Sequence, residues 1–152
     1  MSKALTILGS TGTIGDSTLK VLSLHPDKFS LFALTAYSNC EKMFQQCVVW
    51  EPEYAVMVEE KAADALERKV KKAGLKVQVI WGLAGLEYVA SHPNTDYVMA
   101  GIVGAAGLLP NLAAAQAGKR VMLANKESLV MSGQLFMNAV EENGAQLLPI
   151  DS

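Results

Sequence analysis

The order of apolar and polar positions predicts strands and helices that alternate along the whole chain. Short apolar runs bounded by turn residues are typical of buried strands, and apolar positions three and four residues apart are typical of amphipathic helices. The expected strands are Ala4–Leu8, Phe29–Ala36, Tyr54–Val58, Val77–Trp81, Tyr97–Ile102, Arg120–Ala124 and Gln146–Ile150. The expected helices are Thr13–Leu24, Glu41–Val49, Lys61–Ala73, Leu83–Ala90, Leu108–Ala117 and Lys126–Asn143.

Repeated strand–helix–strand units predict an α/β fold with a doubly wound, mostly parallel sheet of about seven strands and helices on both faces. In such sheets ligands bind at the carboxyl ends of the strands. The loops that follow strand ends are therefore the candidate sites. They are Gly9–Gly15, Tyr37–Cys40, Gly101–Gly107, Ala124–Ser128 and Asp151–Ser152.

The loop after the first strand carries the pattern G-x-x-G-x-x-G, at Gly9, Gly12 and Gly15. A strand, a glycine turn and a helix in this order are typical of a Rossmann-like fold that binds a dinucleotide. Gly9 permits a sharp turn, Gly12 permits close approach of a ligand, and Gly15 permits tight helix packing. Helix-start N–H groups, with the hydroxyls of Thr11 and Thr13, can donate to phosphate oxygens. The alternative is a glycine-rich turn without a ligand.

Composition narrows the classes of partner. The chain has 152 residues, of which 51% are hydrophobic and 18% charged, as expected for one globular domain. A net charge of −2 without a basic stripe argues against nucleic-acid or membrane partners. The chain enters its first strand at once, without a signal peptide, so we expect a cytoplasmic protein. Cys40 and Cys47 lack metal-ligand spacing and are expected to be reduced thiols.

The loop after the second strand bears on the choice of dinucleotide. NAD-binding Rossmann domains usually carry a carboxylate there, which accepts hydrogen bonds from the ribose hydroxyls. Here Tyr37, Ser38 and Asn39 contain none, and Ser38 and Asn39 can donate to a 2′-phosphate. This favours NADP(H), although no Arg or Lys stands in the loop. The alternative is a polar turn that caps the next helix.

Two later strand ends carry candidate chemistry. Asn125, Lys126 and Glu127 follow the sixth strand and can bind an amide, an anion and a hydroxyl, or can simply start a helix. Asp151 and Ser152 follow the seventh strand. A carboxylate there suits Mg²⁺ or Mn²⁺, but one ligand is too few for a stable site. We therefore expect the chain to be a fragment of a longer protein.

Taken together, four segments closely resemble the 1-deoxy-D-xylulose 5-phosphate reductoisomerase family. They are Gly9-Ser-Thr-Gly-Thr-Ile-Gly15, Gly104-Ala-Ala-Gly-Leu-Leu109, Ala124-Asn-Lys-Glu-Ser-Leu-Val130 and Leu147-Leu-Pro-Ile-Asp-Ser152. The resemblance implies an enzyme that makes 2-C-methyl-D-erythritol 4-phosphate for isoprenoid biosynthesis. It also implies NADPH, a divalent cation (Mg²⁺ or Mn²⁺), a phosphorylated sugar substrate and a homodimer.

The resemblance also implies roles for single residues. Cofactor binding falls to the glycine loop, to the turn after the second strand and to the sixth strand end. Lys126 and Ser152 would contact substrate, and Asp151 would be the first metal ligand. The cofactor-binding residues would be Gly9, Thr11, Gly12, Thr13, Ile14, Gly15, Ser38, Asn39, Asn125 and Glu127.

Two departures from the family pattern stand out. Ser38 occupies the position where the family often has Lys, which bears on recognition of the 2′-phosphate. The chain also stops before the family's other metal ligands. We therefore expect residues 1–150 to form the NADPH-binding domain and residues 151–152 to begin a catalytic domain that is otherwise absent. Such a fragment is expected to bind NADPH without turnover.

Two alternatives remain open from the sequence. One is another NADP-dependent dehydrogenase, such as a semialdehyde dehydrogenase, which requires a catalytic Cys. The other is a non-catalytic Rossmann-type module for sensing or protein interaction, which would leave Lys126 and Asp151 without a role.

Overall fold

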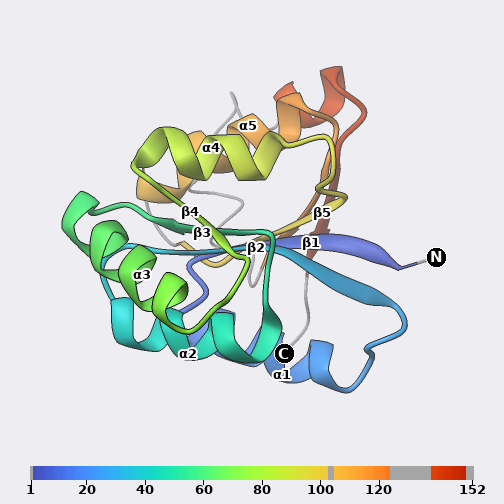
Figure 1. Cartoon of the computed structure of the whole chain (residues 1–152). Helices are drawn as coiled ribbons and strands as arrows, with labels where there is room; N and C mark the ends of the chain where they lie inside the picture. Colours follow the sequence, from blue (N-terminus) through green and yellow to red (C-terminus); the bar gives the residue numbers. More distant parts are fainter. Residues whose placement is uncertain (1, 103–104, 124–137, 150–152) are drawn as a thin grey trace.

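The computed structural model describes residues 2–102, 105–123 and 138–149. Its centre is one seven-stranded sheet in the order β4-β3-β2-β1-β5-β6-β7. Every neighbouring pair of strands runs parallel (Figure 1). The strands are β1 (Lys3–Leu8), β2 (Phe29–Ala36), β3 (Tyr54–Met57), β4 (Gln78–Trp81), β5 (Tyr97–Ala100), β6 (Arg120–Leu123) and β7 (Gln146–Pro149).

Helices cover both faces of the sheet. Figure 1 shows α1 (Thr13–Ser23), α2 (Cys40–Trp50) and α3 (Glu60–Lys72) below it. On the other face lie α4 (Leu83–Ser91) and α5 (Leu108–Gln116), which is preceded by a 3₁₀ turn at Ala105–Gly107. Residues 138–142 are also helical. None of the helices in the described part of the chain is long and apolar enough to span a membrane.

The two faces bury different residues of the same strands, because successive side chains of a strand point to opposite sides. Leu5 and Ile7 of β1 pack toward α1, α2 and α3, in a core that also includes Met43 and Leu66. Leu8 of β1 packs on the opposite side, in the core that α5 covers. The near-continuous apolar runs in the strands therefore reflect burial on both faces.

The strand order reverses beside β1. The chain moves outward from β1 to β4, crosses the sheet with α4, and then moves outward again from β5 to β7. The helices that follow β1 and β5 therefore lie on opposite faces and leave a crevice at the carboxyl ends of these two strands.

Close backbone approach at this crevice requires glycine at two positions. Gly9 has φ +80°, a left-handed conformation that L side chains rarely adopt. A Cβ on Gly101 would lie 2.4 Å from the Leu8 carbonyl oxygen, which accepts a hydrogen bond from the Gly101 N–H at 2.9 Å. β1 and β5 thus touch backbone to backbone where they end.

The doubly wound parallel fold is confirmed, and the strand Phe29–Ala36 has the bounds that the sequence predicts. The fifth strand was predicted to reach Ile102 but ends at Ala100, because Gly101 bonds to the Leu8 and Met99 carbonyls and leaves the ladder. Of the predicted helix Lys126–Asn143, only residues 138–143 lie in the described part. Residues 138–142 are helical and Asn143 is in the turn that follows.

Candidate functional site

The glycine loop lies at the crevice, between the end of β1 and the start of α1. Gly12 is the residue before α1, with φ −85° and ψ −177°, and it provides no side-chain cap. The N–H groups of the first helical turn are therefore not capped from that position and can bind an anion. The nearest neighbour of a Cβ built on Gly12 is the Gly9 carbonyl oxygen at 3.7 Å. The space over Gly12 is thus open, as close approach of a ligand requires.

Gly15 has the opposite surroundings. A Cβ there would lie 2.3 Å from the Ser10 carbonyl oxygen. The predicted role of Gly15, tight packing of the helix against the preceding chain, is therefore structural. Gly12 thus leaves space for a ligand, whereas Gly15 avoids a steric clash with Ser10.

A buried polar network fixes the loop to β2. The Gly9 N–H donates to Thr35 Oγ1 at 2.9 Å, and Thr35 Oγ1 donates to the Ile7 carbonyl at 3.1 Å. The Ser10 N–H donates to the Thr35 carbonyl at 2.7 Å. The side chains of Ser10 and Thr35 are fully buried. Buried polar groups with complete hydrogen bonding hold one conformation, so the start of the loop is rigid.

Helix α2 holds the loop through Gln46. Gln46 Nε2 donates to the Ser10 carbonyl at 2.9 Å, and its Oε1 accepts from Ser10 Oγ at 2.8 Å. Both ends of one amide are therefore used on one residue of the glycine loop. Gln46 lies among the apolar positions Met43 and Cys47 on the buried side of α2. A polar residue in that apolar pattern is a sequence signal for a buried hydrogen-bonding role.

Lys42, one turn earlier on α2, holds the next residue of the loop. Its Nζ donates to the Thr11 carbonyl at 2.9 Å and lies 2.6 Å from Asp16 Oδ2 in α1. Lys42 and Gln46 are four residues apart and so share one side of the helix. Neither residue could be linked to the loop from sequence spacing, because their partners are distant in the chain.

The turn after β2 leaves its side chains exposed at the same edge. Tyr37, Ser38 and Asn39 are all exposed, and 68% of the Tyr37 surface is accessible. Asn39 Oδ1 accepts from the Lys42 N–H at 3.2 Å, so the capping interpretation of Asn39 is correct. Capping leaves the Asn39 amide NH₂ and the Ser38 hydroxyl at the surface. A ligand can still use them as donors.

An apolar cavity of about 320 Å³ runs beside α1. Thr13 and Ile14 of the glycine loop line it, together with Met99 of β5 and Met122 of β6. The predicted loop residues therefore border both a polar, N–H-rich surface and an apolar one. A ligand with a charged centre and a flat apolar end would match this pairing.

One row of residues across the sheet shows that β1, β5, β6 and β7 end at the same edge. Leu8 pairs with Ala100, Ala100 with Leu123, and Leu123 with Pro149. The strands therefore end side by side, about 5 Å apart. The predicted site residues that follow β6 and β7 lie outside the described residues. These are Asn125, Lys126, Glu127, Asp151 and Ser152.

Within residues 2–102, 105–123 and 138–149, no group of three or more His, Cys, Asp or Glu side chains is placed to hold a metal ion. The described residues therefore do not form a metal site. Asp151, the predicted metal ligand, lies outside them, and its role stays a prediction.

The two cysteines do not fit a catalytic nucleophile. Cys47 is fully buried, and burial raises the pKa of its thiol to about 12. Burial also raises the pKa of Cys40, despite opposing effects of Lys69 and Arg68. Both residues are thiols at neutral pH, whereas the nucleophile is the thiolate. Neither Cys40 nor Cys47 therefore suits the catalytic role that the semialdehyde dehydrogenase alternative requires.

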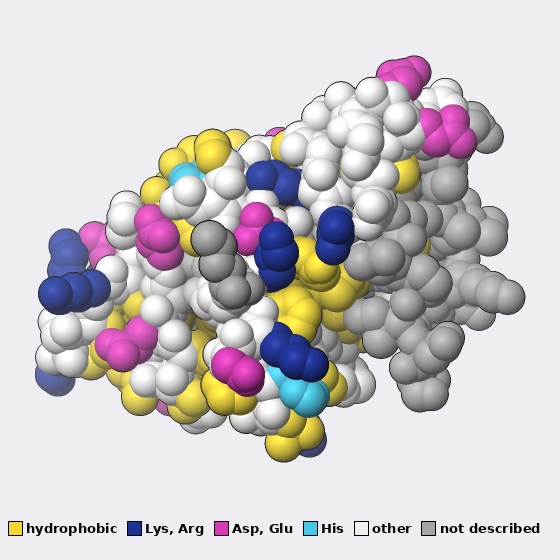
Figure 2. All heavy atoms as spheres, turned by 90° about the vertical axis from the view of Figure 1, so that its right-hand side faces the viewer, with side chains coloured by type: hydrophobic (Ala, Val, Ile, Leu, Met, Phe, Trp, Pro, Cys, Tyr) yellow, Lys and Arg dark blue, Asp and Glu magenta, His cyan; other side chains and the backbone are white. Residues whose placement is uncertain are grey.

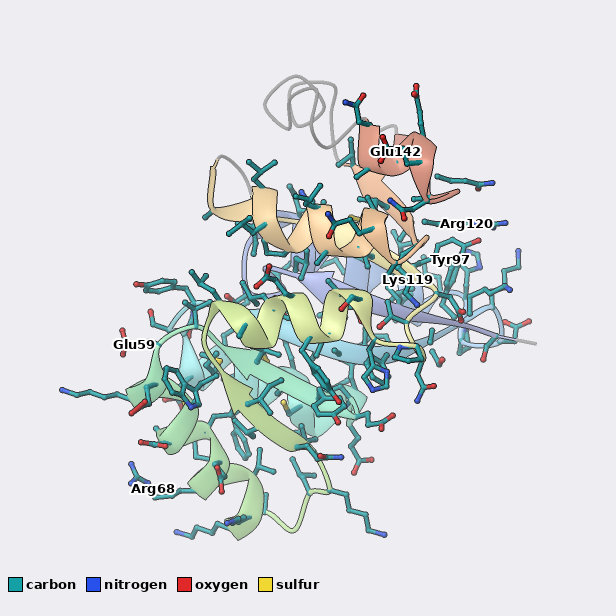
Figure 3. All side chains as sticks on the ribbon, turned by 90° about the horizontal axis from the view of Figure 1, so that it is seen from above. Glu59, Arg68, Tyr97, Lys119, Arg120 and Glu142 are labelled. Atoms are coloured by element: carbon teal, nitrogen blue, oxygen red, sulfur yellow. The ribbon has the colours of Figure 1, made fainter. Side chains whose placement is uncertain are left out.

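The amino ends of the strands, opposite the glycine loop, carry an arginine–tyrosine pair. Arg120 Nη1 donates to Tyr97 Oη at 2.6 Å, and its guanidinium lies 5.4 Å from the centre of that ring. Figure 3 shows Tyr97, Lys119 and Arg120 together at one end of the molecule and Glu59, beside the turn after β2, at the other. Figure 2 shows Lys and Arg side chains around hydrophobic ones on the side near the N-terminus. Lys119 and Arg120 lie at the amino end of β6, away from the glycine loop.

We expect Gln46→Leu to lower the free energy of unfolding by about 2 kcal/mol, because the Ser10 hydroxyl and carbonyl would stay buried without partners. Chemical denaturation followed by circular dichroism measures this change. Gln45→Leu is the matched control, because Gln45 is exposed on the same helix, and its effect should stay within about 0.5 kcal/mol. Equal effects of the two variants would contradict the role of Gln46.

Comparisons with known proteins agree with this geometry. The family model described as 1-deoxy-D-xylulose 5-phosphate reductoisomerase matches residues 5–133. The enzyme of that name from Methylobacillus flagellatus is 58% identical over 152 residues, which are 100% of this chain and 38% of the relative. The chain thus spans well under half the length of this relative.

Solved structures of the same enzyme are similar in fold. One, in complex with NADPH, fosmidomycin and magnesium, has a TM-score of 0.92 and 45% identity, over 99% of this chain and 36% of that one. Another, from Zymomonas mobilis with NADPH, has a TM-score of 0.90 and 38% identity, over 100% and 39% of the two chains. With the family model matching most of its length, the chain belongs to the 1-deoxy-D-xylulose 5-phosphate reductoisomerase family.

Proposed function

We propose that this chain is the NADPH-binding part of a metal-dependent reductoisomerase. The complete enzyme would convert 1-deoxy-D-xylulose 5-phosphate to 2-C-methyl-D-erythritol 4-phosphate in isoprenoid biosynthesis. The observation that carries the proposal is the open space over Gly12 beside the start of α1, at the crevice between β1 and β5. Two similar solved structures contain NADPH, which supports the choice of cofactor.

The described residues suit the two halves of a dinucleotide differently. The first-turn N–H groups of α1 and the hydroxyls of Thr11 and Thr13 would bind the pyrophosphate. The adenosine half would lie toward Ser38 and Asn39, at the end of β2. The nicotinamide half would lie toward the ends of β5 and β6, which adjoin the apolar wall formed with Ile14. NADPH, when bound, supplies the hydride of the reduction.

The chain's own contribution to catalysis is to hold the cofactor in position. The bonds from Thr35 and Gln46 fix the loop before the cofactor arrives, so little freedom is lost when it binds. A rigid loop also fixes the position of the nicotinamide relative to the substrate, which favours reaction by orientation.

We further propose that residues 1–150 form the cofactor domain and that residues 151–152 begin the catalytic domain. Lys126 and Ser152 would contact the phosphorylated sugar, and Asp151 would be one ligand of Mg²⁺ or Mn²⁺. Asn125 and Glu127 would contact the cofactor. The complete enzyme would be a homodimer in the cytoplasm. The match to magnesium-bound relatives supports the metal, and two thiols without a disulfide suit a reducing compartment.

Gly12→Ala tests the site. We expect it to weaken NADPH binding at least about tenfold, because the methyl group would occupy the space needed by the pyrophosphate. Its stability should hardly change, since no atom lies within 3.4 Å of that Cβ. Titration of NADPH fluorescence and thermal unfolding measure the two quantities.

Gly74→Ala is the control, because it should lower stability and leave NADPH binding unchanged. Gly74 ends α3 with φ +73°, so alanine there should cost about 1 kcal/mol of stability and leave NADPH affinity unchanged. Full NADPH affinity in Gly12→Ala would show that the cofactor does not approach this loop.

The chain alone should not turn over. With 1-deoxy-D-xylulose 5-phosphate, NADPH and Mg²⁺, absorbance at the NADPH band should stay constant, because the described residues include no metal site and the chain spans 38% of its relative. The full-length protein is the positive control. Metal-dependent oxidation of NADPH by the chain would refute this expectation.

A further inference from the structure

The 2′-phosphate of NADPH needs a cation that the turn after β2 does not supply. Tyr37, Ser38 and Asn39 contain no Arg or Lys. A phosphate dianion bound by neutral donors alone would gain little over the ribose hydroxyl of NADH. Charge-assisted hydrogen bonds are roughly twice as strong as neutral ones. A preference for NADPH therefore requires a cation from another element.

Lys42 is placed to be that cation. Its backbone N–H is bonded to Asn39, which belongs to the turn after β2. Its ammonium is bonded to the carbonyl of Thr11, which belongs to the glycine loop. The side chain therefore crosses from one loop to the other. In a Rossmann-like fold the adenosine ribose lies between these same two loops.

The charges around Lys42 leave its ammonium available. Its one ion-pair partner among the described residues is Asp16, at 2.6 Å, and the side chains of Lys42 and Asp16 are 34% and 43% exposed. A partly exposed pair of this kind is screened by solvent, so a bound phosphate can compete with Asp16 for the ammonium. Of the neighbouring cations, Lys69 lies 5.5 Å from the ring centre of Phe44 instead. The helix dipole of α2 adds positive potential at the same end.

We propose that Lys42 binds the 2′-phosphate of NADPH and sets the preference for NADPH over NADH. Asp16 holds the ammonium beside the glycine loop when no cofactor is bound. The phosphate then takes over part of its hydrogen bonding. This assignment rests on the proposed NADPH-binding function and adds the residue that discriminates between the two cofactors.

The test measures the Kd of NADPH and of NADH for the chain with Lys42→Met, which keeps length and removes charge. NADPH should bind about 10- to 100-fold more weakly. NADH should bind only a few-fold more weakly, because it loses the loop contact through Thr11 but no phosphate contact. Lys42→Arg should retain most of the preference. Lys20→Met is the matched control, because Lys20 is an exposed lysine in the last turn of α1, and it should change neither Kd.

Asp16→Asn provides a test in the opposite direction. It keeps a hydrogen-bond acceptor near Lys42 but removes a negative charge near the phosphate, so NADPH should bind a few-fold more tightly relative to NADH.

The outcomes separate the possibilities. Equal losses for NADPH and NADH in Lys42→Met would overturn the proposal and make Lys42 a residue that only positions the glycine loop. Unchanged binding of both would also overturn it. If the unmodified chain binds neither cofactor, the proposed function itself fails.

Discussion

The helices that follow β1 and β5 leave the sheet toward opposite faces, and this divergence keeps the ends of two neighbouring parallel strands uncovered. At this point the backbones of Leu8, Gly9 and Gly101 come into direct contact. A Cβ at Gly101 would overlap the Leu8 carbonyl, and Gly9 has a positive φ. The crevice, the glycine loop and the first turn of α1 all adjoin this contact, which accepts only glycine at positions 9 and 101 without strain.

The loop in that crevice is held from two sides by polar groups rather than by apolar packing. Thr35 of β2 bonds to Gly9 and Ser10, while Lys42 and Gln46 of α2 bond to Thr11 and Ser10. β2 and α2 are thereby both linked to the loop at the place where a phosphate would bind. A loop ordered in advance loses little conformational entropy on binding, which raises affinity without additional contacts.

Much of the fold could be predicted because local signals and tertiary structure agree. Phe29–Ala36 is a buried apolar run with the bounds of β2, and Gly74 ends α3 in a left-handed conformation as its place after a helical pattern indicates. The motif Gly9–Gly15 also identified the crevice. β5 was predicted two residues too long, since apolar residues continue past the point where Gly101 turns to β1.

The support around the site could not be predicted in the same way. The partner of Lys42 is 31 residues away and that of Gln46 is 36 residues away, so no local spacing links them to the loop. Asn39 shows a related ambiguity, because a cap and a ligand donor have the same sequence pattern, and the structure shows that it caps α2. The roles of Asn125, Lys126, Glu127, Asp151 and Ser152 rest on resemblance to the family.

The most direct test of the cofactor site is an NMR titration of the ¹⁵N-labelled chain with NADPH. We expect amide shift changes to concentrate at Gly9–Gly15, at Tyr37–Lys42 and at Gly101, which share the carboxyl edge of the sheet. Lys28, Tyr97 and Arg120, at the amino edge, should change little. Shift changes confined to the amino edge, or no changes at millimolar NADPH, would contradict a cofactor site between β1 and β5.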